Sequence, residues 1–149
     1  MVDVWFYHLE QRTLNDVLPD LLTRTLERGW RATIRCGSPE KLDALDKHLW
    51  VFDEASFLPH GKTGDKHSHE HPVWLTSGDD MPNKPNLVFL VEGADPPPPD
   101  GLERIIDLFD GNDLDAVSAA RLRFKAAKDA GHNVTYWQQE ENGRWAQKA

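Results

Sequence analysis

The sequence predicts a three-layer α/β domain with a mainly parallel sheet flanked by helices. Short runs rich in β-branched and aromatic residues alternate with segments whose leucines recur at helical spacing, and glycines or prolines stand between them. This alternation is typical of strand–helix–strand units, whose strands run parallel. The 149 residues suit a single domain, numbered 1–149, with 138–149 as a candidate flexible tail.

The first predicted unit is a strand, a helix and a second strand. The runs VDVWFYHL, residues 2–9, and RATIRC, residues 31–36, have the composition of strands. The leucine-rich segment between them predicts a helix that stops at Gly29. Because Pro19 fits only the first turn of a helix, this helix is expected to begin near Asp16.

A second helix is predicted within residues 37–50. Ser38 is a suitable N-cap, and Pro39 suits the first helical position. Glu40 would face the positive end of the helix. From 51 to 71 no hydrophobic period holds, so a long loop is expected there.

The second half predicts three more strands and a final helix. Residues 73–76 and 86–93 are short apolar strands, and the proline run within 94–101 is a stiff connection. Residues 102–110 have no decisive period, and we favour a strand because the segment is short and lies between breakers. The alanine-rich segment 112–131 predicts a strong helix that a glycine ends.

The composition restricts the classes of function. With 17 basic and 25 acidic residues the formal net charge is −8, so contact with DNA is expected only indirectly or locally. The single cysteine, Cys36, excludes an intramolecular disulfide and favours a reducing, cytoplasmic location, where it is expected as a small buried apolar group. The start lacks the pattern of a secretory signal, and no run of about 18 apolar residues exists, so no membrane contact is expected.

Sequence motifs for catalysis are missing, and neither a catalytic residue nor a cofactor is assigned. There is no G-x-S-x-G, no G-x-G-x-x-G after a strand and no H-E-x-x-H. Gly61-Lys62-Thr63 resembles the end of a phosphate-binding loop, but the first glycine of that motif is replaced by Ser56. The polar residues after Thr63 cannot begin the helix that the motif requires.

Histidines alternate in the same loop, at His67, His69 and His71. In an extended chain alternate side chains point the same way, so these three could converge on a metal ion. Structural zinc sites usually gather ligands from separate elements, however, and a solvated polar loop is the simpler interpretation. The competing hypothesis is a small metal-dependent or nucleotide-handling enzyme centred on residues 60–71.

An apolar cluster precedes this loop. Trp50 closes the second predicted helix, and Phe57, Leu58, Pro59 and His60 follow within a short distance. The rings either seal an edge of the core or form an exposed patch for a partner protein, since aromatic anchors dominate binding energies. The sequence leaves both interpretations open.

The final helix carries a concentrated group of cations. At 100° per residue Arg121, Lys125 and Lys128 fall on one stripe, with Phe124 at its border and Arg123 nearby. A charged stripe is often only a solvated face. In so acidic a protein, a basic groove with an aromatic edge also suits an acidic peptide that ends in an apolar residue.

These features resemble the chi subunit of bacterial DNA polymerase III, a clamp-loader accessory subunit. The resemblance spans residues 1 to about 137. Its motifs are Phe6-Tyr7-x-Leu9, Leu49-Trp50 with Ser56-Phe57-x-Pro59-His60, and Arg121-x-Arg123-Phe124-Lys125 through Ala130-Gly131-x-Asn133. It implies a Rossmann-like fold without nucleotide binding, no activity of its own, and a role in DNA replication. An α/β interaction module unrelated to replication is the other alternative.

The resemblance also implies partners. Arg121 and Lys125 would meet the acidic C-terminal tail of single-stranded-DNA-binding protein, and Phe124 would line a pocket for the last phenylalanine of that tail. Family members can have tyrosine at the position of Phe124. A second surface, for the psi subunit or a helicase, would lie at Trp50, Phe57 and Pro59.

Overall fold

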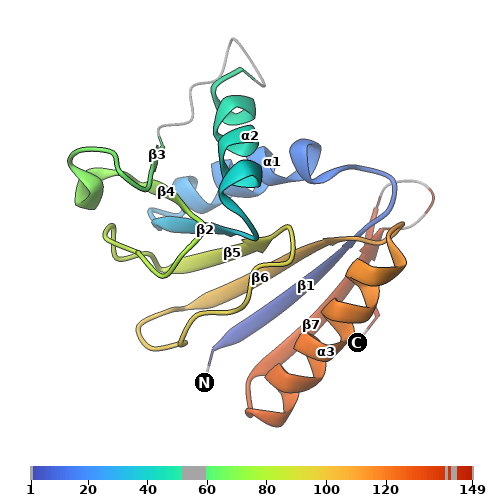
Figure 1. Cartoon of the computed structure of the whole chain (residues 1–149). Helices are drawn as coiled ribbons and strands as arrows, with labels where there is room; N and C mark the ends of the chain where they lie inside the picture. Colours follow the sequence, from blue (N-terminus) through green and yellow to red (C-terminus); the bar gives the residue numbers. More distant parts are fainter. Residues whose placement is uncertain (1, 52–59, 140, 142–143, 149) are drawn as a thin grey trace.

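The computed structural model describes residues 2–51, 60–139, 141 and 144–148, with residues 50 and 51 described for their backbone only. Over these residues one eight-stranded sheet has the order β3-β4-β2-β5-β6-β1-β7-β8 (Figure 1). All neighbours are parallel except β8, which is antiparallel to β7. The strands are β1 Asp3–Leu9, β2 Ala32–Cys36, β3 Gly61–Lys62, β4 Val73–Thr76, β5 Leu87–Val91, β6 Arg104–Asp110, β7 Asn133–Gln139 and β8 Trp145–Gln147. The predicted α/β fold with a mainly parallel sheet is confirmed.

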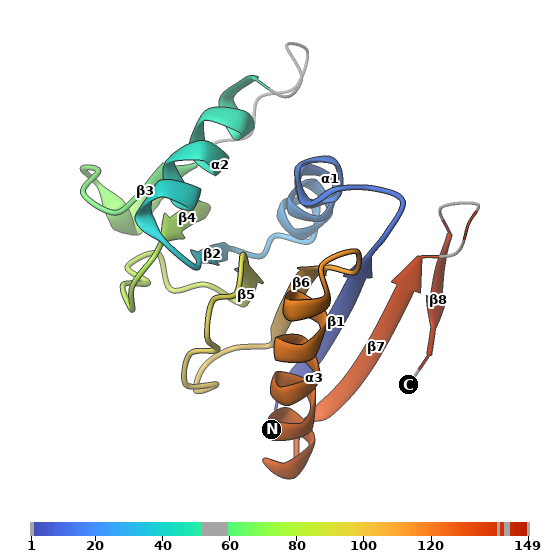
Figure 2. The same ribbon diagram turned by 45° about the vertical axis from the view of Figure 1, so that its right-hand side comes forward.

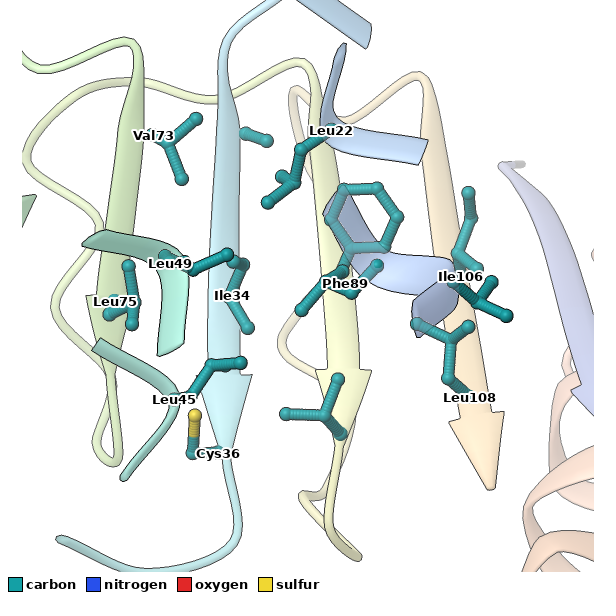
Figure 3. Close-up of a cluster of buried hydrophobic side chains, with 14 of the residues drawn as sticks. Leu22, Ile34, Cys36, Leu45, Leu49, Val73, Leu75, Phe89, Ile106 and Leu108 are labelled. Carbon is teal, nitrogen blue, oxygen red and sulfur yellow. The ribbon is translucent and has the colours of Figure 1, made fainter. Parts of the chain in front are cut away.

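Helices cover both faces of this sheet. Helices α1, Leu14–Glu27, and α2, Pro39–Val51, lie on one face, and α3, Leu114–Asp129, lies on the other (Figures 1 and 2). Two separate cores result because successive side chains of a strand point to opposite faces. Figure 3 shows part of the larger core, in which Leu22, Leu45 and Leu49 of the helices face Ile34, Leu75, Phe89 and Ile106 of the strands.

Helix α1 begins two residues earlier than its proline suggested. Thr13 caps it, and the side chain of Asp16 reaches back to the Thr13 backbone N–H at 3.2 Å, which completes a capping box. Pro19 therefore lies in the second turn, where it cannot donate to the Asn15 carbonyl. That carbonyl instead accepts a hydrogen bond from His48 Nε2 of α2 at 2.8 Å. A side chain from the neighbouring helix thus replaces the bond that the proline removes.

The chain after residue 131 adds strands that the sequence analysis did not assign. Asn133–Gln139 forms β7 next to β1, and Trp145–Gln147 forms β8 within the segment treated as a candidate tail. The segment expected as a long loop also contains order, since Gly61–Lys62 pairs with β4 and Ser68–Glu70 forms a turn of 3₁₀ helix. The preference for a strand at residues 102–110 is confirmed by β6.

Candidate functional site

Helix α3 is fixed in place at both ends. The side chain of Asp113 accepts hydrogen bonds from the backbone N–H groups of Asp115 and Ala116, which satisfies two donors at the helix start. Val117 and Ala120 are buried against the sheet. Gly131 follows the helix with a φ of 86°, a left-handed conformation that ends it. The helix therefore presents its remaining faces to solvent in a defined orientation.

One exposed face of α3 carries the predicted cation stripe. The side chains of Arg121, Lys125 and Lys128 are all exposed, and the Nζ atom of Lys128 lies 5.0 Å from the centre of the Phe124 ring. Within the described part of the chain none of these three cations forms an ion pair. Three uncompensated cations on a protein of net charge −8 create a local positive potential.

Arg123, which the sequence analysis placed near this stripe, has a different environment. Its Nε and Nη2 atoms donate to the two carboxylate oxygens of Asp107 at 2.6 and 3.2 Å. The Asp107 side chain is 2% exposed on β6, and burial raises its pKa while the hydrogen bonds and charge of Arg123 oppose that rise. Arg123 therefore joins the helix to the sheet, and its guanidinium is turned away from the cation stripe.

Aromatic rings border the cation stripe on the side of β7. Phe124 is half-buried, with its ring centre 5.4 Å from Phe6 and 5.8 Å from Tyr136. Burial raises the pKa of Tyr136 and the charge of Arg121 opposes the rise, which places that guanidinium near the phenol. Tyr136 is thus a member of the site that the sequence analysis missed. The period-two run NVTYWQQ after Gly131 is the signal that could have revealed it.

A chain of hydrogen bonds holds the Tyr136 ring. The hydroxyl lies 2.5 Å from Nδ1 of His8, and Nε2 of His8 lies 2.9 Å from the Glu10 carboxylate. Because Nε2 faces a carboxylate, it carries the proton, and Nδ1 accepts from the tyrosine. Gln138 donates to the same Glu10 oxygen at 2.8 Å. The ring that borders Arg121 is therefore held in one orientation.

The opposite flank of α3 is apolar. A groove of about 400 Å³ separates the helix from the proline run, and Leu122, which is 72% exposed, lies at its rim. Its lining includes Leu122, Ala126 and Ala130 of the helix with Pro96, Pro97 and Pro99. Phe124 does not line this groove. The cations and the groove therefore occupy separate flanks of the same helix.

The crevice at the carboxyl ends of the strands is unsuited to a nucleotide. This position binds nucleotides in many open α/β sheets. Here a cavity of about 590 Å³ is lined by the carboxylates of Glu10, Glu92, Asp110, Asp113 and Asp115 along with the cations Arg12, Lys41 and Arg123. The turn after β1 reads Glu10-Gln11-Arg12, without the glycines that let a backbone approach a pyrophosphate.

The histidines of the loop do not converge. His67 takes a left-handed conformation with a φ of 56°, and the 3₁₀ turn that follows breaks the extended geometry on which convergence depended. His67 and His69 point to solvent, whereas His71 packs beside Trp74 and faces the Lys66 carbonyl at 3.2 Å. Across the described ranges no group of three metal-ligating side chains is found.

The incomplete phosphate-binding motif forms the edge of the sheet instead. Lys62 lies on β3, and its Nζ atom is 3.4 Å from Asp43 and 3.6 Å from Asp46. The backbone N–H of Thr63 donates to the Leu75 carbonyl of the neighbouring strand at 3.0 Å. The lysine and the backbone donor that a phosphate would require are therefore already engaged.

The second predicted surface is described only in part. Phe57, Leu58 and Pro59 lie outside the described residues, and Trp50 is placed by its backbone at the end of α2. His60 is buried, with Nε2 3.0 Å from the Asp46 carboxylate. His60 therefore anchors the chain to α2 and does not present its ring to a partner.

The lone thiol is buried and lacks the environment of a nucleophile. Cys36 is 2% exposed at the end of β2, and burial raises its pKa to about 12, with the charge of Glu92 adding to the rise. A nucleophilic cysteine needs a lowered pKa. The prediction of a small buried apolar group is confirmed.

The fold and these sites define an α/β protein with an exposed cation stripe, an apolar groove and an acidic strand-end crevice. A family model for the DNA polymerase III chi subunit, HolC, matches residues 1–135, so the chain belongs to that family of accessory replication subunits. A probable DNA polymerase III subunit chi of Rickettsia prowazekii (strain Madrid E) is 20% identical over 89 residues, 60% of this chain. The match spans 54% of that relative, about half its length. Among the described helices none is long and apolar enough to cross a membrane.

Proposed function

We propose that this chain is a non-catalytic subunit of the DNA polymerase III holoenzyme that binds the acidic C-terminal tail of single-stranded-DNA-binding protein. The single observation that carries the proposal is the exposed, unpaired cation stripe of α3 beside an aromatic edge. Membership of the chi family supports the setting in replication. Binding the tail would link the protein-coated template to the clamp loader, and through the α3 surface contact with DNA would be indirect.

The chemistry of the α3 surface fits such a tail. An acidic peptide that ends in phenylalanine offers carboxylates along its length, one ring and a free carboxylate. Arg121 can hold a carboxylate through two parallel hydrogen bonds, and Lys125 and Lys128 extend the positive field along the helix. Phe124 and Tyr136 border these cations and provide an apolar edge for the terminal ring.

We also propose a second partner surface and the absence of catalytic activity. The psi subunit or a helicase would bind the surface that includes Trp50 and Phe57, with Pro59 beside them. The absence of catalysis is part of the proposal, and membership of a family of accessory subunits supports it. The alternative of a metal-dependent enzyme centred on the histidine loop has no geometric support within the described residues.

Titration with a tail peptide tests the proposal. The peptide should copy the acidic tail of the single-stranded-DNA-binding protein from the same organism. Arg121→Ala should weaken binding by about 30-fold, because a charge-assisted pair contributes about 2 kcal/mol. Lys125→Ala should cost less and Lys128→Ala least, since more exposed pairs are more strongly screened.

A matched control separates this stripe from net charge. Arg12→Ala removes one exposed cation from the far side of the sheet, where Arg12 pairs with Asp20 at 3.0 Å. It should leave the affinity within about two-fold of the parent, as expected for a distant exposed charge. Parent-like binding by both Arg121→Ala and Lys125→Ala, at low salt and with the fold intact, would exclude α3 as the tail site.

A further inference from the structure

Four of the six tryptophans of the chain gather at one margin of the sheet. They are Trp5, Trp30, Trp137 and Trp145, and each is partly exposed. Trp5 and Trp137 lie on adjacent strands with ring centres 6.3 Å apart, and Trp145 on β8 lies 4.8 Å from Tyr7. These side chains lie on the face opposite α3, where they pack against the edge of the larger core and stay partly exposed. The four indoles come from separate segments, so the fold alone brings them together.

Arginines accompany these rings. The Arg104 guanidinium lies 3.8 Å from the centre of the Trp5 ring and 5.3 Å from that of Trp30, and Arg28 lies 4.4 Å from Trp30 on the same face. Arg24, one turn before Arg28 on α1, is near enough to Tyr7 to oppose the rise in its pKa that burial causes. We call Arg24, Arg28 and Arg104 with the four tryptophans the arginine–tryptophan face.

The charges of this face are not neutralised within the protein. Arg24, Arg28 and Arg104 form no ion pair with any described residue, although the Asp3 carboxylate is near enough to Arg104 to oppose the fall in its pKa. Burial lowers the pKa of Arg104, and the neighbouring charge of Arg28 lowers it further. Like charges held side by side repel each other, and a bound anion would relieve that repulsion. The chain is acidic as a whole, yet within its described residues no carboxylate forms an ion pair with these arginines.

Two N–H donors in the same cluster also have no acceptor in the described part of the chain. They are Nε of Arg104 and Nε1 of Trp137, and both atoms are buried. A buried donor without a partner costs free energy comparable to a lost hydrogen bond. A cluster that served only to seal the core would be expected to pair such groups and to bring carboxylates to its arginines.

We propose that the arginine–tryptophan face binds single-stranded nucleic acid directly. Single strands are held by aromatic side chains on which bases stack and by cations that follow the phosphates. A guanidinium stacked on an indole keeps its N–H edges free for a phosphate, so the Arg28 and Arg104 stacks combine both functions. The net charge of −8 disfavours binding of nucleic acid to surfaces that lack such cations. The inference is independent of the tail site on α3, which lies on the other face of the sheet.

Fluorescence titration of the full chain with an oligothymidylate of about 20 nucleotides tests this site. Binding should quench tryptophan emission, because four of the six indoles belong to the face. A double variant Arg24→Gln/Arg28→Gln, which changes two exposed side chains, should bind about ten-fold more weakly at low salt. Its plot of log affinity against log salt should be shallower by about 1.4, since each lost phosphate contact on a single strand contributes about 0.7.

The matched control removes the same charge from the other face. Lys125→Gln/Lys128→Gln should keep the oligonucleotide affinity within about two-fold of the parent while losing affinity for the acidic tail peptide. The Arg24→Gln/Arg28→Gln protein should show the reverse. The proposal is overturned if the parent shows no saturable binding at low salt, if both double variants lose affinity equally, or if the tail peptide displaces the oligonucleotide from the parent.

Discussion

The carboxylate of Asp107 and the guanidinium of Arg123 form a bidentate ion pair that joins β6, near the centre of the sheet, to α3. The two N–H···O distances are 2.6 and 3.2 Å, and the aspartate side chain is 2% exposed. This pair fixes the rotation of α3, the helix that carries the proposed tail site. Arg121 then faces β7 and Leu122 faces the groove.

Removing one partner of this pair should destabilise the protein strongly. Arg123→Met keeps the length of the side chain and leaves Asp107 buried without its partner. We expect a loss of about 3–5 kcal/mol in the free energy of unfolding, the range for breaking a buried ion pair. Denaturant unfolding measures it. A loss below about 1 kcal/mol would mean that solvent reaches the carboxylate.

The destabilisation should also depend on pH. Burial raises the pKa of Asp107, and the hydrogen bonds and charge that oppose that rise come from Arg123. The folded state then binds a proton more tightly than the unfolded state, so the stability of Arg123→Met should fall as pH rises above about 4. Adding Asp107→Asn to Arg123→Met should remove this slope. An unchanged slope in the double variant would assign it to another group.

The buried thiol of Cys36 can report on unfolding of the protein. Burial raises the pKa of Cys36 to about 12, above its ordinary value of 9.0. A thiol reagent at about pH 8 should therefore not label the folded protein, and labelling should follow unfolding in denaturant. The sign of the linkage also predicts that stability falls as pH rises from 9.0 toward 12. Cys36→Ala should lose less stability than the parent over that interval.

Gly61 has a specific steric role. A Cβ atom at this position would lie 2.6 Å from the ring of His71, closer than non-bonded carbon atoms approach. Gly61→Ala should therefore lower the free energy of unfolding by about 1–3 kcal/mol, as overpacking does. All three nearest atoms belong to His71, so adding His71→Ala should restore most of the loss. Failure of the second change to rescue the first would locate the strain in the backbone.

The sequence alone predicts the elements that have strong local signals. Helix α3 followed from its alanine-rich period and its glycine stop, and β6 followed from its short length between breakers. The cation stripe needed only helical geometry. The same geometry turns Arg123 away from that stripe. Its pairing could not be predicted, because its partner Asp107 lies on a strand and only the fold brings the two together.

Other features depend on contacts between distant segments. The arginine–tryptophan face combines residues from β1, β6, β7 and β8 with the end of α1, and no spacing in the sequence links them. The convergence of the three histidines was a reasonable hypothesis for an extended chain, but a left-handed residue at His67 and the following turn redirect them. Edge strand β3 has two residues, too few for a periodic signal.

Helix α3 has two flanks that could take the terminal ring of the tail. Two apolar surfaces lie within reach of Arg121: the Phe124–Tyr136 edge on one side and the groove at Leu122 on the other. We expect the ring at the first, because the three cations lie on that side and Lys128 already contacts Phe124. A terminal carboxylate held by Arg121 would keep the adjacent ring close to the same side.

Variants at the two flanks show whether the terminal ring binds at the Phe124–Tyr136 edge or in the groove at Leu122. Tyr136→Ala removes the ring of the edge, and we expect tail affinity to fall by about ten-fold, whereas Leu122→Ala should change it by less than about two-fold. Tyr136→Phe serves as the control, because it keeps the ring and loses only the hydroxyl that bonds to His8. It should bind the tail within about three-fold of the parent, since the hydroxyl faces the histidine and not the peptide. A large loss from Leu122→Ala with none from Tyr136→Ala would place the terminal ring in the groove and assign to Phe124 a purely structural role.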